Sequence, residues 1–592
     1  AIVAWVESHL GVGTTPSAEP AHAAPEEAAP ADAAPVEDDP SAPQSDIPDS
    51  AVRAVFRAVP APLVGAQRDI RVPAGGDITV VNDGRGVAPL VASLLESHGV
   101  GARVVEPDGI PDVSGGIVHI GLLHPGPHGV VDLFEQVHAA AVAGASTLVA
   151  VTGLGGTHGR CTSGGAASHL GVTPAPAPVG ETENGTQGTD ETDRTEDGTK
   201  RENPERARRI GQTGAGVAGL WRALARERPD AHVRAVDLDP LDDPVVLAGQ
   251  IVAEVLAAGG PVAVGYRDGE RYTVVAAEEV LANGPGSSPD QASRIDRPRR
   301  ARGIDLGPDS VVLLTGGARG ITARLAVSLA TTYGCSLELV GRSPVPDGPE
   351  DPELASATGA AELRQRLIAR GERTPAAIEA SVARLLAARE IRSTLSALDD
   401  AGVKVAYHAV DVRDADAVRG VVDSVYDRHG RLDGVVHGAG VIEDRLLADK
   451  TSESFRRVFD TKVHAAHTLV GAVREPHPFV VLFTSVSGAF GNKGQVDYAA
   501  ANDALSALAW SLTAQEFGPV VAVDWGPWAG SGMVTPQLDR EYARRRVGLV
   551  HPEDGIARLL DELRACLPQP EIVLARARVS TFEAPAVAME QP

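Results

Sequence analysis

The stretch "VVLLTGGARGITARLAVSLA", Val311 to Ala330, decides the fold of this chain of 592 residues. It reads as an apolar strand, a glycine-rich turn and a helix in immediate succession. Gly316 and Gly320 let the backbone approach a pyrophosphate, and the helix N-terminus offers free N–H groups and a positive dipole. Thr322 stands where the third glycine of the usual spacing would be. The stretch therefore predicts a dinucleotide site.

Short apolar strands separated by helical segments follow this turn. Strands that alternate with helices form a doubly wound parallel sheet, with its site at the carboxyl ends of the strands. An insert rich in helix formers, about residues 344–401, lies between the second and third strands. The fold class is therefore predicted as α/β, with a Rossmann sheet of these strands: Ser310–Gly316, Ser336–Arg342, Lys404–Val412, Asp433–Gly440, Phe479–Gly488, Val520–Gly526 and Glu571–Ala577.

An earlier region, residues 51–300, carries a second α/β pattern. Its strand Asp77–Asp83 leads into a helix at Val87–Gly99, but the intervening "NDGRG" has no G-x-G-x-x-G spacing. A closing hairpin is predicted in "PVAVGYRDGERYTVV". We expect a structural domain without a cofactor here.

Composition divides the rest of the chain. Residues 1–50 read as the end of a helix followed by an Ala/Pro/Glu-rich linker, with no Lys or Arg before Arg53. A second low-complexity stretch, about 160–208, is expected to be a disordered surface insertion. Residues 301–585 form the predicted catalytic subdomain and 586–592 a tail. The start at Ala1 suggests a piece of a longer polypeptide.

The totals exclude several classes of function. A formal net charge of −25 argues against a nucleic-acid binder, whose footprint is a basic patch. No apolar run is long enough for a membrane span. The three cysteines show no metal-ligand spacing, so no metal site is predicted, and they are expected to be reduced thiols of a cytoplasmic protein.

The ends of the second and third strands favour one cofactor. Arg342 and Ser343 stand where an NAD enzyme usually has an acid, and arginine suits a 2′-phosphate, so NADPH is favoured over NADH. Asp411 is expected at the adenine amine and the Val412 backbone against its ring. The predicted cofactor contacts are Thr315, Gly316, Gly317, Arg319, Gly320, Ile321, Arg342, Ser343, Asp411, Val412, Gly438, Ala439 and Gly440.

Two residues after the nucleotide strands have the chemistry of carbonyl reduction. Ser485 ends the fifth strand and can donate a hydrogen bond to a carbonyl, and Tyr498, thirteen residues later, can hand over a proton. A tyrosine has an ordinary pKa near 10, so a nearby cation is needed to lower that pKa. Such sites usually carry a lysine four residues after the tyrosine, where this chain has Asn502.

Taken together, these motifs resemble the ketoreductase domain of polyketide and polyunsaturated-fatty-acid synthases, in the short-chain dehydrogenase/reductase superfamily. The resemblance runs from about Ala51 to Ala577 and is carried by "TGGARGIT", "LVGRS", "HGAGVIEDRLL", "FDTKVHAAHTL", "TSVSGAFGNKGQVDYAAAN" and "DWGPWAGSGM". It implies a truncated Rossmann-like structural subdomain ahead of an NADPH-binding catalytic one. The helical insert and the tyrosine motif are closest to iterative synthases of the polyunsaturated-fatty-acid or enediyne type.

The resemblance also answers the question of the lysine. In this family lysine and asparagine exchange places, and Lys462 in "FDTKVHAA" matches the lysine position. It implies that Lys462 lowers the pKa of Tyr498, that Ser485 orients the carbonyl and that Tyr498 donates the proton. Asn502 would hold the hydrogen-bonded geometry.

The same comparison bears on the hand of the product. Family members that give the D-configured (3R) alcohol tend to carry Leu-Asp-Asp where this chain has Ile442, Glu443 and Asp444. Those of the opposite hand tend to carry Trp eight residues before the tyrosine, where this chain has Phe490. The resemblance therefore favours the D-alcohol.

The leading hypothesis is NADPH-dependent reduction of a β-ketoacyl thioester that an acyl carrier protein presents on a phosphopantetheine arm, beside neighbouring synthase domains. One alternative is a reductase-shaped scaffold that only docks those domains, which the intact Ser–Tyr–Lys–Asn set argues against. Another is a free-standing short-chain dehydrogenase, which the large first region and the linker argue against.

Overall fold

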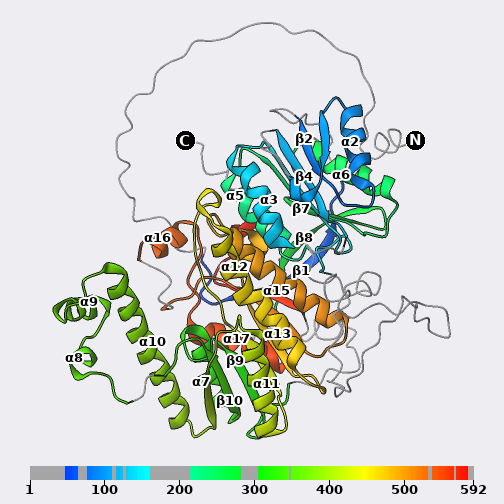
Figure 1. Cartoon of the computed structure of the whole chain (residues 1–592). Helices are drawn as coiled ribbons and strands as arrows, with labels where there is room; N and C mark the ends of the chain where they lie inside the picture. The colour runs from blue at the N-terminus through cyan, green and yellow to red at the C-terminus, as the bar shows by residue number, and fades with distance from the viewer. Residues whose placement is uncertain are drawn as a thin grey trace, which may run out of the picture.

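Among the residues that the structure describes, 15 strands form one sheet, in the order β11-β10-β9-β12-β13-β14-β15-β1-β8-β7-β6-β5-β4-β2-β3 (Figure 1). The computed structural model describes residues 47–63, 77–109, 115–124, 129–160, 214–281, 304–345, 348–530, 536–565 and 569–583. The predicted α/β class with a doubly wound parallel sheet is confirmed. The predicted linker up to residue 46, residues 161–208 of the predicted insertion and the tail 586–592 lie outside the described residues.

The catalytic half, as we call the predicted catalytic subdomain of residues 301–585, contains a parallel sheet between two apolar cores. Its strands are β9 (Val311–Thr315), β10 (Ser336–Gly341), β11 (Val405–Ala409), β12 (Gly434–His437), β13 (Phe479–Ser485), β14 (Val520–Trp525) and β15 (Glu571–Ala575). Within β9, Val312 and Leu314 face one core while Val311 and Leu313 face the other. Such strands, buried on both faces, read as the continuous apolar runs seen in the sequence.

The helices of this half follow the predicted alternation. They are α7 (Gly320–Tyr333), α8 (Pro352–Ala355), α9 (Ala360–Ala369), α10 (Pro375–Asp400), α11 (Ala415–His429), α12 (Ser452–Phe459), α13 (Ala465–Ala472), α14 (Val486–Phe490), α15 (Val496–Ala514), α16 (Pro536–Arg544), α17 (Pro552–Arg564) and α18 (Val579–Glu583). A π-helical turn, Asp460–His464, joins α12 to α13 and carries Lys462. Turns of this kind are frequent at functional sites.

The first half contains β2 (Ile78–Val81), β3 (Ala102–Val105), β4 (Gly116–Leu122), β5 (Thr147–Thr152), β6 (His232–Asp237), β7 (Ala263–Arg267) and β8 (Glu270–Glu278), with helices α2 (Val87–Ser97), α3 (Val130–Val142), α5 (Val217–Glu227) and α6 (Pro244–Leu256). The predicted closing hairpin is the antiparallel pair β7–β8. After β2, the Asp83 carboxylate accepts hydrogen bonds from the Val87 and Ala88 N–H groups at 3.1 and 3.0 Å. The Asp83 carboxylate therefore satisfies two of the N–H groups at the start of α2.

Strand β1 (Val52–Pro60) joins the two halves. It pairs antiparallel with β15 on one side and with β8 on the other. Only the middle of β1, residues 54–56, is buried, and arginines interrupt its apolar run on both sides. The sequence pattern alone therefore does not single it out as the centre of the sheet.

Helix α15 is held in place by close backbone contact with α5. A Cβ atom at Gly216 would lie 2.5 Å from the Ala500 carbonyl oxygen, and one at Gly219 would collide with the Ala499 carbonyl. Gly216 also has φ 97°, which favours glycine. Helix α15 contributes the small side chains of Ala499 and Ala500 to the same contact, so the first half fixes the position of α15.

A buried ion cluster reinforces this contact between the halves. The Arg160 guanidinium donates to Asp503 of α15 at 2.8 Å and to Glu571 of β15 at 2.7 and 2.9 Å. All three side chains are at most 3% exposed. Trp510 donates to the same Glu571 carboxylate at 2.7 Å.

Removal of the cation should destabilise the whole chain. We expect Arg160→Met to lower the free energy of unfolding by on the order of 3–5 kcal/mol, because it leaves two buried carboxylates without their main partner. Thermal or urea unfolding of the full chain measures this loss. Arg419→Gln, which breaks an exposed pair with Asp416, is the control and should leave stability nearly unchanged. Equal effects of the two substitutions would contradict the role given to Arg160.

Candidate active site

Four predicted catalytic residues come from three neighbouring elements. Ser485 is the last residue of β13, Tyr498 is the third residue of α15 and Asn502 follows one turn later. Lys462 comes from the π-helical turn before α13. Lys462 thus approaches the tyrosine from a helix other than the one that carries Tyr498.

The ammonium group of Lys462 is buried between Gly440 and the tyrosine. Its Nζ donates to the Phe483 carbonyl at 2.8 Å and lies 5.5 Å from the centroid of the Tyr498 ring. A Cβ atom at Gly440 would lie 3.0 Å from the Lys462 Cε atom, so glycine makes room for the lysine there. Burial lowers the pKa of Lys462 to about 8, against the attraction of Asp524.

The tyrosine is shielded from water. Burial raises the pKa of Tyr498 to about 12, and hydrogen bonding by the Asn502 and Ser485 side chains opposes this rise. Asn502 Nδ2 donates to the Tyr498 carbonyl at 2.7 Å, and Asn502 Oδ1 is buried without a hydrogen-bond partner among the described residues. Burial thus outweighs the expected lowering of the Tyr498 pKa by Lys462, whose ammonium lies 5.5 Å from the ring centroid.

His437 fixes the backbone beneath this site. Its Nε2 lies 2.9 Å from the Lys462 carbonyl, and its Nδ1 lies 2.8 Å from the Thr315 hydroxyl. Burial and the Lys462 charge lower the pKa of His437 to about 3, so the ring is neutral. Because a carbonyl can only accept, Nε2 carries the proton and Nδ1 accepts from Thr315. His437 is a structural residue, in agreement with its position in the sequence pattern.

The glycine turn lies directly beside the chain that leads to the lysine. Gly316 has φ 73°, and a Cβ atom there would lie 3.1 Å from the Gly438 carbonyl and 3.2 Å from the Ala439 nitrogen. Space is open in front of Gly320, where α7 begins. Thr322, at the position of the missing third glycine, packs its side chain where Gly438 has none. The absence of a side chain at Gly438 therefore leaves the space that the Thr322 side chain fills.

The predicted dinucleotide site, here called the cradle, has several cationic side chains at its adenosine end. Arg342 is exposed after β10, and its charge helps to lower the pKa of Asp411. Arg413, which the sequence pattern did not single out, donates to Asp411 at 2.7 Å. The Tyr407 hydroxyl donates to the Ser343 carbonyl at 2.6 Å and so fixes the turn after β10. Two arginines thus flank the predicted adenosine end.

The four predicted stereochemical residues separate into different environments. Asp444 accepts from Gln495 at 2.9 Å and its charge contributes to the raised pKa of Tyr498, so it lies by the site. Glu443 instead pairs with Arg457. Ile442 is 42% exposed, and the Phe490 ring stacks on that of Phe582 with centroids 5.2 Å apart.

A buried ion pair ties the Asp444 loop to the tyrosine. Lys450 Nζ donates to Asp497 at 2.8 Å and also to the Glu443 carbonyl. Asp497 in turn accepts from the Tyr498 N–H at 2.9 Å. The pair was not predicted, since Lys450 and Asp497 lie 47 residues apart.

The described ranges are 47–63, 77–109, 115–124, 129–160, 214–281, 304–345, 348–530, 536–565 and 569–583. Within them, no three His, Cys, Asp or Glu side chains gather as metal ligands. Also within them, no helix has the length and apolar character that crossing a membrane requires. Cys335 is a buried free thiol whose pKa is raised by burial to about 11.

Known proteins resemble the chain in both sequence and fold. Residues 310–530 match the model of the KR domain family. A polyunsaturated fatty acid synthase from Thraustochytrium is 33% identical over 360 residues, 58% of this chain but 12% of that protein. The polyketide synthase GfsA of Streptomyces halstedii is 32% identical over 336 residues, 55% of this chain and 4% of that protein. The chain thus spans only a small part of these relatives.

Solved structures support the fold. The ketoreductase from the first module of phoslactomycin biosynthesis in Streptomyces superposes with a TM-score of 0.58 at 21% identity, over 90% of this chain and 95% of that one. A structure of A-type ketoreductases from a modular polyketide synthase gives 0.59 at 20% identity, over 90% and 94%. At this identity the likeness shows the shared fold of both halves.

The buried lysine should make stability depend on pH. Its folded pKa of about 8 lies below the ordinary 10.5, so the folded chain binds the proton more weakly than the unfolded chain does. The resulting cost is complete below pH 8 and disappears as pH rises toward 10.5. We expect Lys462→Met to be more stable than the parent at pH 7, by up to on the order of 3 kcal/mol, with the difference shrinking above pH 8.

Thermal unfolding of both proteins between pH 7 and 10.5 measures the difference. The exposed Lys493 provides the control, because Lys493→Met should show no such trend. A stability difference for Lys462→Met that stays constant across this range would contradict the buried charge.

Proposed function

Because residues 310–530 form a KR domain of the kind found in polyketide and polyunsaturated-fatty-acid synthases, within the short-chain dehydrogenase/reductase superfamily, we propose that this chain reduces a β-ketoacyl thioester to the β-hydroxyacyl thioester. NADPH is the proposed hydride donor. The proposed substrate is held on the phosphopantetheine arm of an acyl carrier protein.

One observation carries the proposal, namely the meeting of Ser485, Tyr498, Asn502 and Lys462 beside Gly440, which follows the Gly438–Ala439 segment packed against Gly316. Ser485 and Tyr498 are the two hydroxyl donors that a carbonyl oxygen needs in order to be held and then protonated. A scaffold would have no need to keep a charged lysine in the interior, where its burial costs free energy.

The charges support tyrosine as the proton donor. With a pKa of about 12, Tyr498 stays protonated at neutral pH and can give its proton to the more basic alkoxide that reduction leaves. The Lys462 ammonium, 5.5 Å from the ring centroid, stabilises the tyrosinate that remains. Asn502 holds the Tyr498 backbone, and its free Oδ1 is an acceptor for a group or water that enters the site.

The cradle fits a nicotinamide dinucleotide. Gly316 and Gly320 give the backbone the close approach that a pyrophosphate requires, and NADPH, when bound, supplies the hydride. Arg342 and Arg413 at the far end would hold a 2′-phosphate, since the turn after β10 offers no acid for a ribose hydroxyl. Ala439 and Gly440 would lie along the nicotinamide ribose, as the resemblance implies.

A carrier protein and the D-configured (3R) product complete the proposal. The relatives are synthases of which this chain spans only a small part, which supports neighbouring domains as its partners. Gln495, three residues before Tyr498, donates a hydrogen bond to the Asp444 carboxylate, and the charge of Asp444 contributes to the raised pKa of Tyr498. We therefore assign the choice of hand to the Asp444 loop more than to Phe490.

Turnover of NADPH with a β-ketoacyl thioester tests the reaction. We expect Tyr498→Phe and Lys462→Ala each to lower kcat by at least about 100-fold, because the first removes the proton donor and the second the stabilising charge. Chiral chromatography of the product should give the D-alcohol. Tyr426→Phe, which changes a tyrosine on α11 bonded to Arg474, is the matched control and should keep full activity.

Several outcomes would refute parts of the proposal. Full activity of both variants would refute the catalytic assignment, and a strict preference for NADH would refute the assignment of NADPH. Reduction of free ketones without any reduction of thioesters would favour a free-standing dehydrogenase. Absence of dinucleotide binding by the parent would favour the scaffold.

A further inference from the structure

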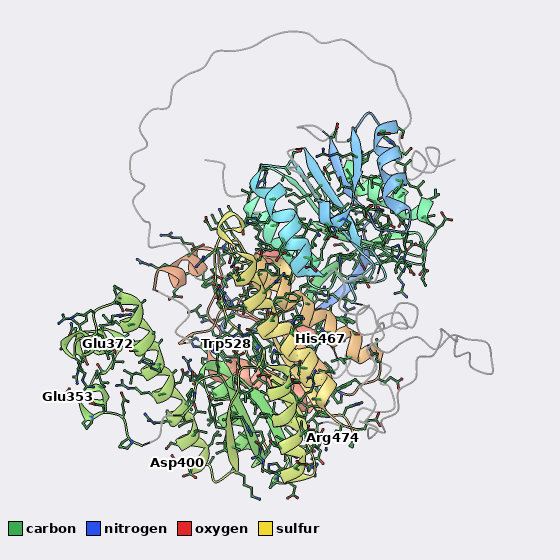
Figure 2. All side chains as sticks on the ribbon, in the orientation of Figure 1. Glu353, Glu372, Asp400, His467, Arg474 and Trp528 are labelled. Atoms are coloured by element: carbon green, nitrogen blue, oxygen red, sulfur yellow. The ribbon has the colours of Figure 1, made fainter. Side chains whose placement is uncertain are left out.

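The helical arm inserted between β10 and β11 reaches the glycine turn. Helices α8, α9 and α10 project from the catalytic half (Figure 1). Glu353 and Glu372 lie at the outer end of the arm, and Asp400, the last residue of α10, lies next to the sheet (Figure 2). The arm thus projects from the catalytic half and joins it at the C-terminal end of α10.

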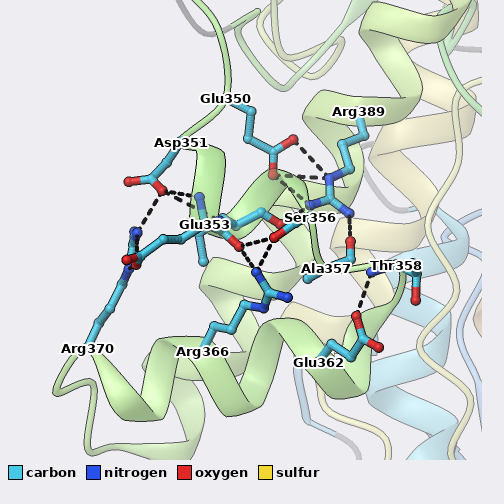
Figure 3. A network of polar contacts seen from close by, with 11 residues as sticks. Glu350, Asp351, Glu353, Ser356, Ala357, Thr358, Glu362, Arg366, Arg370 and Arg389 are labelled. Atoms are coloured by element: carbon cyan, nitrogen blue, oxygen red, sulfur yellow. Dashed lines mark hydrogen bonds and ion pairs between the residues drawn. The ribbon is translucent and has the colours of Figure 1, made fainter.

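Ion pairs hold the helices in the outer part of the arm together. Arg389 of α10 pairs with Glu350 at 2.7 Å, and Arg370, directly after α9, pairs with Asp351 and Glu353 at 2.6 and 2.7 Å (Figure 3). A small apolar core, which includes Leu363, lies among the three helices. The direction of α10 is therefore fixed by the arm itself.

Two residues on one face of α10 touch the glycine turn. The Thr394 hydroxyl donates to the Ala318 carbonyl at 3.1 Å. One turn earlier, Glu390 Oε1 accepts from the Gly320 N–H at 2.6 Å, and Glu390 Oε2 accepts from Arg319 Nε at 2.9 Å. Residues spaced by four share a helix face, so α10 presents both groups together.

The Glu390 carboxylate therefore lies where the chemistry favours a phosphate. It bonds an N–H group at the N-terminus of α7 and a guanidinium at once. The Gly316 N–H donates to the Val340 carbonyl at 2.7 Å, so the glycine turn that carries Arg319 adjoins the end of β10. The 2′-position of the adenosine ribose is recognised at the end of that strand.

From this geometry we infer that Glu390 is a cofactor-specificity residue, which weakens the preference for NADPH over NADH by neutralising Arg319. The inference rests on the proposed binding of a nicotinamide dinucleotide. A carboxylate beside the arginine competes with the doubly charged 2′-phosphate, but it does not oppose an uncharged 2′-hydroxyl. NADPH and NADH share their pyrophosphate, so any effect on the α7 N-terminus cancels in the ratio of the two affinities.

Equilibrium binding of both cofactors to the full chain tests the inference. We expect Glu390→Gln to raise the ratio of NADPH to NADH affinity by about fivefold to tenfold, an effect that shrinks at high salt. Glutamine keeps an acceptor for the Gly320 N–H, and thermal unfolding of the variant checks that the fold is retained. Glu379→Gln, which also lies on α10 and breaks the pair between Glu379 and Arg364 of α9, is the matched control and should leave the ratio unchanged.

The same substitution in an Arg319→Gln chain tests whether Arg319 mediates the effect of Glu390 on the affinity ratio. In an Arg319→Gln chain, the further change Glu390→Gln should leave the ratio unaltered. A ratio that stays constant or falls in the single variant, or that rises equally in the Arg319→Gln chain, would overturn the inference.

The outcomes also separate the inference from the proposed reaction. A ratio shift in a chain that reduces no β-ketoacyl thioester would uphold the inference while refuting the reaction. Conversely, normal turnover with an unchanged ratio would refute the inference alone. Absence of binding of either dinucleotide would refute both.

Discussion

A positive charge held in the interior, on Lys462, is the constraint on which the catalytic half depends. The ammonium needs an acceptor, which the Phe483 carbonyl at the end of β13 provides, and it needs space, which Gly440 provides. The position of Lys462 between α12 and α13 is set by the π-helical turn that carries it. Because these requirements come from different elements, β12, β13 and the turn before α13 must keep their relative positions for the site to exist.

The local part of this arrangement could be predicted from the sequence. The strand, glycine turn and helix of residues 311–330 follow one another along the chain, and local pattern is what sequence records best. The lysine could be assigned only through resemblance, since no spacing rule connects Lys462 to Tyr498. The fit of Thr322 against Gly438 was not predictable, because it depends on two segments that meet only in the folded sheet.

Long-range electrostatic contacts were also beyond prediction. Arg160 and Asp503 lie 343 residues apart, and Arg319 and Glu390 lie 71 residues apart. In a chain with so many charged residues, composition cannot say which pairs will meet. The first half, which has a carboxylate where a phosphate turn would be, supports the site through such contacts and through the glycine face of α5. The side chains of the site thus lie in short sequence motifs, whereas the contacts that hold these motifs in place join distant parts of the chain.

The position of β1 has a consequence for how the chain is made. Residues 52–60 leave the ribosome long before one of their two partners, β15, which begins at Glu571. One edge of β1 therefore stays without its native partner until β15 has been synthesised, and an unpaired edge can bind a wrong strand. The first half can close around β8 before that, but the continuous sheet forms only when β15 pairs with β1.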